Sequence, residues 1–201
     1  MMPRVGILGW VAWGVAFAQS GCAPRTIAPL PAETERWVSA PSSMAVLSQA
    51  ERLDGVPGAL TFGGTSGRSA LYLQFPSEWR ERGAPLAAFI ALEPREDAAN
   101  DSASVRVEAW RVRSAWCAST LHTWSDKPEL APPYARGMAS SSPPKPLRID
   151  VSELLRFATE NPELDHGIAL IASGGSGAGA TFSTGMDGGA APRLEVYFRT
   201  P

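Results

Sequence analysis

Two tryptophans of this chain stand beside charged residues in the way that sugar-binding sites require. Trp110 shares the polar face of an alternating segment with Arg106, and Arg113 follows three residues later. Trp79 lies within a Glu-Trp-Arg-Glu-Arg segment. A sugar presents apolar C–H groups and many hydroxyls, so its site combines an aromatic platform with flanking polar side chains. Arginine adds bidentate binding of carboxylates, which suits an acidic polysaccharide.

We therefore expect a carbohydrate-binding site with Trp110 as the platform and Arg106 beside it. Arg113 joins this site if a β-bulge changes the phase of the strand. Trp79 is the second candidate platform. The alternative is that these tryptophans close a hydrophobic core and bind nothing.

Catalytic and metal-binding patterns are weak by comparison. The glycine-rich segment 173–179 lacks the lysine of a phosphate-binding loop and the second glycine of a nucleophile elbow, so we interpret it as a turn. The only histidines are His122 and His166, which excludes a histidine-rich zinc site. Carboxylates around Glu93 and Glu163 lie in polar loops, where solvated charge is usual. We predict no enzyme, cofactor or metal, with a polysaccharide hydrolase or lyase as a minor alternative.

The elements that position Trp110 are expected to be β-strands. Apolar and polar residues alternate in VRVEAW (residues 105–110) and in RLEVYF (residues 193–198), which indicates strands with one buried face and one wet face. Clusters of glycine, proline and serine separate these segments from other apolar ones. The pattern predicts an all-β fold, a jelly-roll-like antiparallel β-sandwich.

One short helix is expected near residues 151–160. Asp150 is placed to cap it and Glu153 to complete a capping box, while Leu154 and Leu155 share one helical face. We therefore interpret Asp150 as a cap and not as a general acid.

The ordered series of segments resembles the DNRLRE-type domain, also classed as carbohydrate-binding module family 96. The matching segments are ALYLQF (70–75), AAFIALEP (87–94), Trp116 with TWSDKP (123–128), IDVS (149–152), GIAL (167–170), TFST (181–184) and PRLEVYF (192–198). The resemblance covers roughly residues 51–199, and Cys117 to Ser119 stand where that family has an acidic residue. It implies a secreted or surface-attached bacterial β-sandwich that binds an acidic, alginate-like polysaccharide. Trp116 and Trp124 are expected to be structural.

The N-terminus predicts export. Residues 5–18 form an apolar run that suits a signal-peptide core and is short for a membrane span. Two cleavage sites compete: an Ala-Phe-Ala site that ends at Ala18, and a lipobox, Ser-Gly-Cys, that would leave Cys22 lipidated. We favour lipidation, because a proline-rich segment follows the cysteine. Ala23 after that cysteine implies the outer membrane, whereas cleavage at Ala18 would give a secreted protein.

These features divide the chain into three parts. They are a signal peptide over residues 1–21, a proline-rich tether over residues 22–50 and the sandwich domain over residues 51–201. Within the domain, residues 131–146 are expected to form a long surface loop. Cys117 is interpreted as a partly buried thiol without a role, and its disulfide with the other cysteine is excluded if that one is lipidated.

Two classes of function fit the sequence. The first is a noncatalytic envelope lipoprotein that binds polysaccharide and attaches to the membrane through its lipid anchor. The second is a structural or adhesive envelope module with a protein partner. Nucleic acid is excluded as a partner, because a formal net charge of -2 without clustered basic residues cannot neutralise phosphates.

The anchor can be tested with Cys22→Ser. We expect this substitution to move the protein from the membrane fraction to the soluble fraction, because membrane attachment would depend on the lipid chains. Fractionation followed by mass spectrometry of the N-terminus measures both location and acylation. An unacylated mature terminus at Gln19 in the unsubstituted protein would contradict the lipidation.

Overall fold

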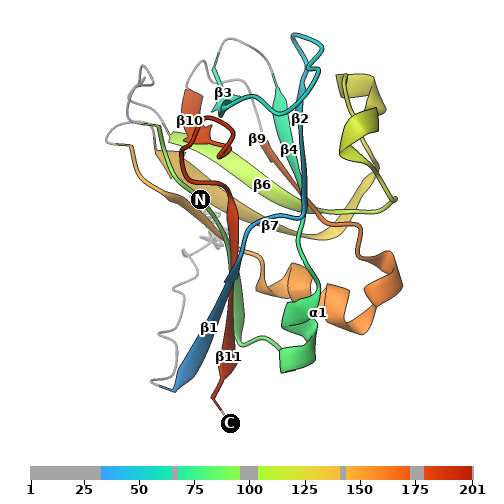
Figure 1. Ribbon diagram of the computed structural model, residues 1–201, viewed down its shortest axis with the longest axis vertical. Coiled ribbons are helices and arrows are strands. Elements are labelled where there is room, and N and C mark those ends of the chain that lie inside the picture. The colour runs from blue at the N-terminus through green and yellow to red at the C-terminus, as the bar shows by residue number, and fades with distance from the viewer. Residues whose placement is uncertain (1–32, 65–67, 96–103, 141–143, 173–178, 201) are drawn as a thin grey trace, which may run out of the picture. The chain divides into compact units, whose positions relative to one another are not determined.

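The computed structural model describes residues 33–64, 68–95, 104–140, 144–172 and 179–200. Antiparallel strands dominate this part of the chain and form three sheets (Figure 1). The four-stranded sheet consists, in spatial order, of β1 (Thr34–Ser39), β11 (Arg193–Arg199), β5 (Ala87–Leu92) and β8 (Leu147–Asp150). The five-stranded sheet consists of β2 (Ser43–Ser48), β4 (Ser69–Gln74), β9 (Ile168–Ala172), β6 (Ser104–Val112) and β7 (Leu130–Ser140). The two-stranded sheet pairs β10 (Gly179–Ser183) with β3 (Ala59–Gly63).

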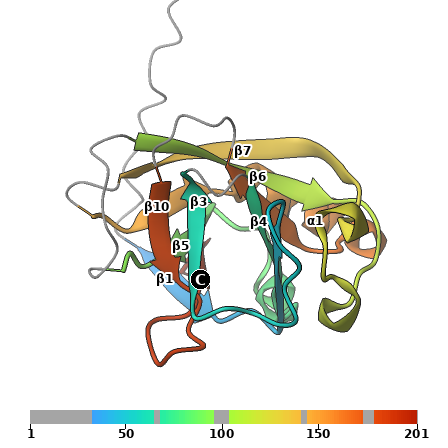
Figure 2. The same ribbon diagram turned by 90° about the horizontal axis from the view of Figure 1, so that it is seen from above.

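The hydrophobic core lies between the four-stranded and the five-stranded sheet. Alternate residues of each strand enter it, because successive side chains of a strand point to opposite faces. The inward residues of the two segments with the clearest alternation are Leu194, Val196 and Phe198 of β11 and Val105, Val107 and Ala109 of β6. Seen from above, β6 and β7 lie across the core from β1 (Figure 2). The predicted antiparallel β-sandwich is therefore confirmed.

The two-stranded sheet continues the four-stranded one past the end of β5. Ser183 of β10 donates its backbone N–H to the carbonyl of Glu93 at 3.0 Å, and the backbone N–H of Arg95 reaches the carbonyl of Thr181 at 3.0 Å. The chain that leaves β5 is thus held beside β10.

The short helix α1 (Ser152–Glu160) confirms the predicted helix, with a different start. Its N-cap is Val151, and Asp150 instead accepts hydrogen bonds from the backbone N–H and the hydroxyl of Ser152, at 3.0 and 2.5 Å. Glu153 pairs with Arg156 along the helix, so the predicted capping box does not form. Leu154, Leu155 and Ala158 are the buried residues that attach α1 to the core.

A second apolar cluster covers the outer face of the five-stranded sheet. Strand residues and a following loop build it: Ala45, Leu47, Ala70, Tyr72, Val112, Leu121 and Ala169, with Trp116 and Trp124 packed against them. The Trp116 ring meets the Tyr72 ring edge-on, with 5.8 Å between centroids. Its Nε1 donates to the carbonyl of His166 at 2.7 Å. These contacts hold the loop down on the sheet.

The TWSDKP segment of that loop is locked by a capping box around the 3-10 helix η3 (Trp124–Asp126). Asp126 accepts hydrogen bonds from the backbone N–H and the hydroxyl of Thr123, at 2.8 and 2.9 Å. These bonds, the backbone one foremost, lower the pKa of the Asp126 carboxyl. Trp124 is thereby oriented onto the cluster that covers the sheet.

The domain begins earlier than the sequence predicted. The segment assigned to a tether, residues 22–50, contains β1 and β2, which form one edge of each large sheet. Trp37 of β1 lies opposite Val196 in the register and packs against the core. The prolines and the lack of long periodicity concealed these strands, since an edge strand needs only a few alternating residues.

The predicted loop over residues 131–146 is corrected as well, because most of it is strand β7. Pro132 and Pro133 fall at a shift in register between β6 and β7, on a strand that has one neighbour in the sheet, where proline is tolerated. Gly137 lets β7 approach β8: a Cβ there would lie 2.6 Å from Cγ1 of Ile149.

The hydroxyl of Tyr72 is buried and has no hydrogen-bond partner among the described residues, and burial raises the pKa of Tyr72 to about 12. A buried hydroxyl without a partner costs about 1 kcal/mol or more. We therefore expect Tyr72→Phe to leave the free energy of unfolding unchanged or raise it by about 1 kcal/mol, measured by urea denaturation. Tyr72→Ala, which also removes the ring, is the contrasting variant and should destabilise by about 3 kcal/mol or more. A large loss of stability in Tyr72→Phe would reveal a partner for the hydroxyl.

Candidate functional site

Trp110 lies on the outer face of β6, where it stacks against Tyr134 of β7. The two rings are 4.3 Å apart between centroids and 17° from parallel. They are directly opposite each other in the β6–β7 register, which explains the contact. Tyr134 is 39% exposed, so the aromatic pair reaches solvent.

Charged side chains fix the polar edges of this aromatic pair. The Nε1 of Trp110 donates to one carboxylate oxygen of Glu108 at 3.0 Å, and the Nε of Arg136 donates to the other at 3.1 Å. A second nitrogen of Arg136 donates to the hydroxyl of Tyr134 at 2.8 Å. The four side chains therefore form one connected group with limited freedom.

The same face of the two strands continues to Arg106 and Met138, which are opposite each other in the register. Arg106 is exposed, and Met138 is 58% exposed. We refer to the outward side chains of these two strands as the β6–β7 patch, which comprises Arg106, Glu108, Trp110, Tyr134, Arg136 and Met138. The structure thus places two of the expected site residues, Arg106 and Trp110, on one face.

The β6–β7 pairing has an irregularity next to Trp110, but it does not bring Arg113 to this residue. The register shifts between Trp110 and Arg111. Arg111 lies over the ring of Phe157 in α1, with its guanidinium carbon 4.3 Å from the ring centroid. Arg113 lies beyond the end of β6, 3.4 Å from a carboxylate oxygen of Glu129. The side-chain alternation is kept through the bulge, because Val112 joins Trp110 on the outer face.

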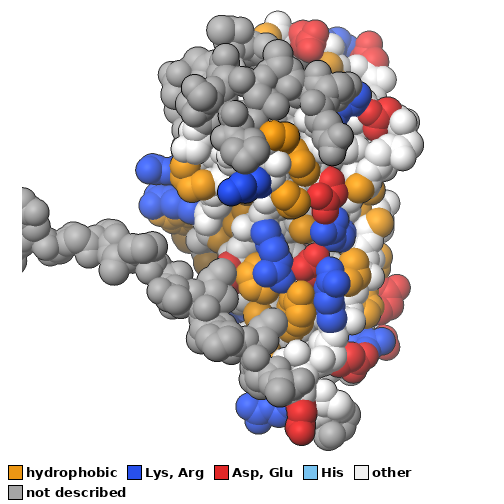
Figure 3. Space-filling model, turned by 90° about the vertical axis from the view of Figure 1, so that its left-hand side faces the viewer, with side chains coloured by type: hydrophobic (Ala, Val, Ile, Leu, Met, Phe, Trp, Pro, Cys, Tyr) orange, Lys and Arg blue, Asp and Glu red, His pale blue; other side chains and the backbone are white. Residues whose placement is uncertain are grey.

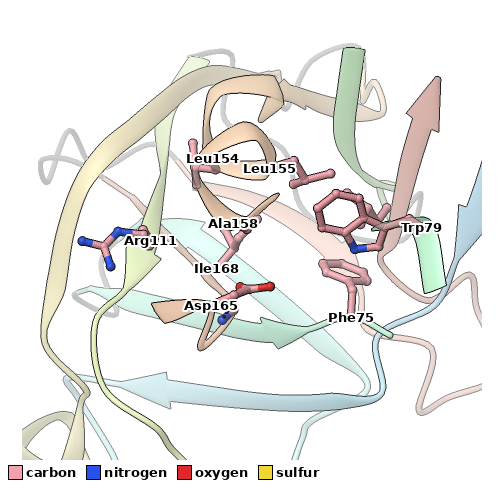
Figure 4. A pocket seen from close by; sticks show the side chains of 10 residues that line it. Phe75, Trp79, Arg111, Leu154, Leu155, Ala158, Asp165 and Ile168 are labelled. Atoms are coloured by element: carbon pink, nitrogen blue, oxygen red, sulfur yellow. Dashed lines mark hydrogen bonds between the residues drawn. The ribbon is translucent and has the colours of Figure 1, made fainter. Parts of the chain in front are cut away.

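Trp79 is a core residue, which corrects the expectation of a second platform. It lies in the 3-10 helix η1 (Glu78–Arg82), is 3% exposed and packs near Phe75 and Leu155 (Figure 4). The cavity that these residues line has a volume of about 30 Å³, room for a water molecule but not for a sugar. Arg80 crosses toward Asp165 and forms an ion pair with it.

A larger pocket, with a volume of about 270 Å³, lies beside β2. Its walls are mainly apolar side chains, and its polar lining consists of Asp54, Ser119 and His122. The ring Nδ1 of His122 is 3.4 Å from the carbonyl of Leu53, which joins the pocket's two loops. The volume is slightly below that of typical ligand pockets, and the imidazole is the one aromatic ring among its described lining residues.

The outer face of the four-stranded sheet carries a cluster of arginines around a buried carboxylate. Glu195 of β11, 3% exposed, accepts hydrogen bonds from Arg36, Arg193 and Arg148 at 2.7, 3.0 and 3.2 Å. The hydroxyl of Tyr197 lies 3.4 Å from the same group. Figure 3 shows this side of the molecule, with basic side chains gathered around acidic ones. We call this the arginine face. The sequence predicted a wet position for Glu195, but its neighbours cover it.

The arginines determine the ionisation of Glu195. Burial, the largest single influence, would raise the pKa of its carboxyl. Hydrogen bonds from Arg193 and Arg36, with the charges of Arg36 and Arg148, outweigh burial and lower that pKa below its ordinary value. The hydrogen bond to Glu93 is the main reason that the pKa of Arg193 is raised. Glu195 is therefore ionised and Arg193 protonated at neutral pH.

Two of the carboxylates considered for catalysis have structural partners. Glu93 binds Arg193 at 2.7 Å, and Asp165 binds Arg80. Glu163 is exposed. Among the described residues, no group of three or more His, Cys, Asp and Glu side chains is arranged to hold a metal ion.

The remaining sequence predictions concern the cysteines and the membrane. Cys117 is exposed and not partly buried, and a hydrogen bond between its thiol and the Ser119 side chain is the main cause that lowers the pKa of the thiol. Cys22 and the glycine-rich residues 173–178 lie outside the described residues. None of the helices in the described ranges has the length and apolar character needed to cross a bilayer.

No protein-family model matches this chain, and no match was found among curated proteins. The resemblance to the DNRLRE-type domain therefore stays a prediction from the sequence.

Glu195→Gln tests the charge of the arginine face. The pKa of Glu195 is lower in the folded chain than the ordinary value of 4.5. Ionised Glu195 therefore stabilises the fold above that pH, and this contribution is lost as the pH falls through the lowered pKa. We expect Glu195→Gln to lower the free energy of unfolding by about 2 kcal/mol at pH 7, since the arginines are partly screened by water.

Denaturation curves of both proteins at several pH values measure this effect. The difference in stability between the unsubstituted protein and Glu195→Gln should shrink as the pH falls below 4.5. Glu153→Gln, at an exposed helix position, is the control and should change the free energy of unfolding little at any of these pH values. A difference that stays constant with pH would show that Glu195 acts only through packing.

Proposed function

We propose that this chain is a noncatalytic cell-envelope module that binds polysaccharide through the β6–β7 patch. The proposal includes export and attachment to the membrane through a lipid on Cys22. The resemblance to the DNRLRE-type domain supports the same class of function.

The observation that carries this proposal is the stacked pair of Trp110 and Tyr134, held by Glu108 and Arg136 on a sheet surface. Aromatic rings bind the C–H faces of sugars, and the carboxylate and guanidinium beside them offer hydrogen bonds to hydroxyls. Because strands and hydrogen bonds fix these groups, little side-chain entropy would be lost on binding. An extended polysaccharide could follow the two strands past Arg106.

The charge pattern of the patch favours a sugar over a protein partner. A surface for an apolar protein partner would be a continuous hydrophobic area. Here Glu108, Arg136 and Arg106 interrupt the apolar side chains of Trp110, Tyr134 and Met138 on the same face. An aromatic pair beside charged side chains matches the C–H faces and the hydroxyl groups of a sugar. An adhesive module with a protein partner remains the alternative that the binding test decides.

Affinity electrophoresis in gels that contain polysaccharide tests this site. We expect Trp110→Ala and Tyr134→Ala each to weaken retention about fivefold or more, because loss of one stacked ring removes about 1 kcal/mol of binding free energy. Thermal unfolding of each variant, followed by circular dichroism, should show a modest decrease in Tm from loss of the ring-to-ring contact.

Met186→Ala is the matched control, because Met186 is an apolar side chain, 62% exposed, in the turn between β10 and β11. It should leave retention unchanged. The proposed site is wrong if Trp110→Ala is folded and is retained as strongly as the unsubstituted protein.

A further inference from the structure

The arginine face has more hydrogen-bond donors than Glu195, the carboxylate at its centre, can accept. A carboxylate has room for about four hydrogen bonds. Glu195 has four neighbours that donate to it: Arg36, Arg148, Arg193 and Tyr197. Its accepting capacity is therefore full, and Glu195 cannot take a further donor.

Arg36 and Arg148 have such further donors. Among the described residues, Arg36 makes its hydrogen bond to protein through one terminal nitrogen, Nη2. Arg148 makes its bonds through Nε and Nη2. The other N–H groups of these two guanidiniums have no acceptor in the described structure, and the side chains are 48% and 42% exposed. Water occupies these donors unless a ligand replaces it.

The guanidiniums are held in place before any ligand arrives. The guanidinium carbon of Arg148 lies 3.5 Å from the centroid of the Phe89 ring, and its Nη2 donates to the hydroxyl of Tyr197 at 3.0 Å. Phe89 and Tyr197 meet edge-on at 5.9 Å. Arg36 reaches Glu195 from the opposite edge of the sheet, because β1 and β8 flank the central strands. Preorganised donors lose little entropy on binding.

The charge of the cluster indicates what kind of anion fits. Three arginines, Arg36, Arg148 and Arg193, face two carboxylates, Glu195 and Glu93, which leaves one positive charge. One unbalanced charge matches a singly charged oxyanion better than a phosphate monoester, which carries nearly two charges at neutral pH. Guanidinium groups bind both carboxylates and tetrahedral oxyanions bidentately.

We propose that the arginine face binds the carboxylate or sulfate-ester groups of an acidic polysaccharide. This surface lies on the opposite side of the sandwich from the β6–β7 patch, so the chain has two binding faces. The arginine face is the one that selects anionic polysaccharides over neutral ones. The inference rests on the proposed function in one respect, the assumption that the ligand is a polysaccharide.

Affinity electrophoresis of the full chain in three gels tests this inference. The gels contain polygalacturonate, dextran sulfate or neutral dextran. We expect Arg36→Gln to weaken retention by the anionic polysaccharides about tenfold, as for loss of a hydrogen bond to a charged group, and to leave retention by dextran unchanged. Retention by the anionic gels should also decrease with salt. Retention by polygalacturonate alone assigns carboxylates, and retention by both anionic gels assigns both oxyanions.

Two further variants test whether a loss of retention comes from the arginine face itself, from the change in net charge or from a loss of folding. Arg156→Gln removes the same charge from an exposed position on α1 and should bind as the unsubstituted protein does. Arg36→Lys keeps the charge beside Glu195 but lacks the planar fork, so it should fold and still bind the anionic gels severalfold more weakly. Thermal unfolding checks that each variant is folded.

The outcomes distinguish this inference from the proposed function. If Arg36→Gln and Arg36→Lys bind the anionic gels as strongly as the unsubstituted protein, while Trp110→Ala does not, the arginine face is not a site and the β6–β7 patch stands. Equal weakening by Arg156→Gln would also overturn the inference, because only the total charge would then matter. Retention in none of the three gels would contradict the proposed function and this inference together.

Discussion

The alternation of side chains along β11 is the constraint on which both the hydrophobic core and the arginine face depend. β11 is a central strand of the four-stranded sheet, between β1 and β5. Its inward residues, such as Val196, fill the core. Its outward Glu195 accepts hydrogen bonds from arginines of β1 and β8. A shift of register by one residue would place a carboxylate in the core and expose the apolar residues. Burial of the core therefore fixes the position of the charged cluster.

Most of the outer face of the five-stranded sheet is covered by a loop and is not accessible to solvent. The loop that contains Trp116 and Trp124 covers the outer faces of β2, β4 and β9. β6 and β7 continue beyond this cover, and their outward residues remain accessible, Tyr134 at 39% and Met138 at 58%. The loop tryptophans thus determine the extent of the β6–β7 patch without belonging to it.

Local patterns in the sequence were sufficient to predict some strands and the helix, but not the remaining strands. The strict alternation in β6 and β11 predicted their buried faces, and helical spacing around Leu154 predicted α1. β1 and β2 were missed because they are short and flanked by prolines. β7 was missed because Pro132 and Pro133 lie within it, at a position that tolerates proline only because β7 pairs on one side. These errors arise from tertiary context, which local propensity does not encode.

The candidate site was also predictable from the sequence only in part. Trp110 and Arg106 could be assigned to one face from alternation alone, whereas their neighbours Tyr134 and Arg136 are more than twenty residues away along the chain. Only the register of β6 with β7 brings them together. Trp79 shows the opposite case, since charges on both sides suggested exposure, but a single 3-10 turn directs the ring inward and the charges outward. An aromatic residue among charged residues therefore indicates a surface site only where the surrounding sequence already shows the alternation of a strand, which tells which side chains point outward.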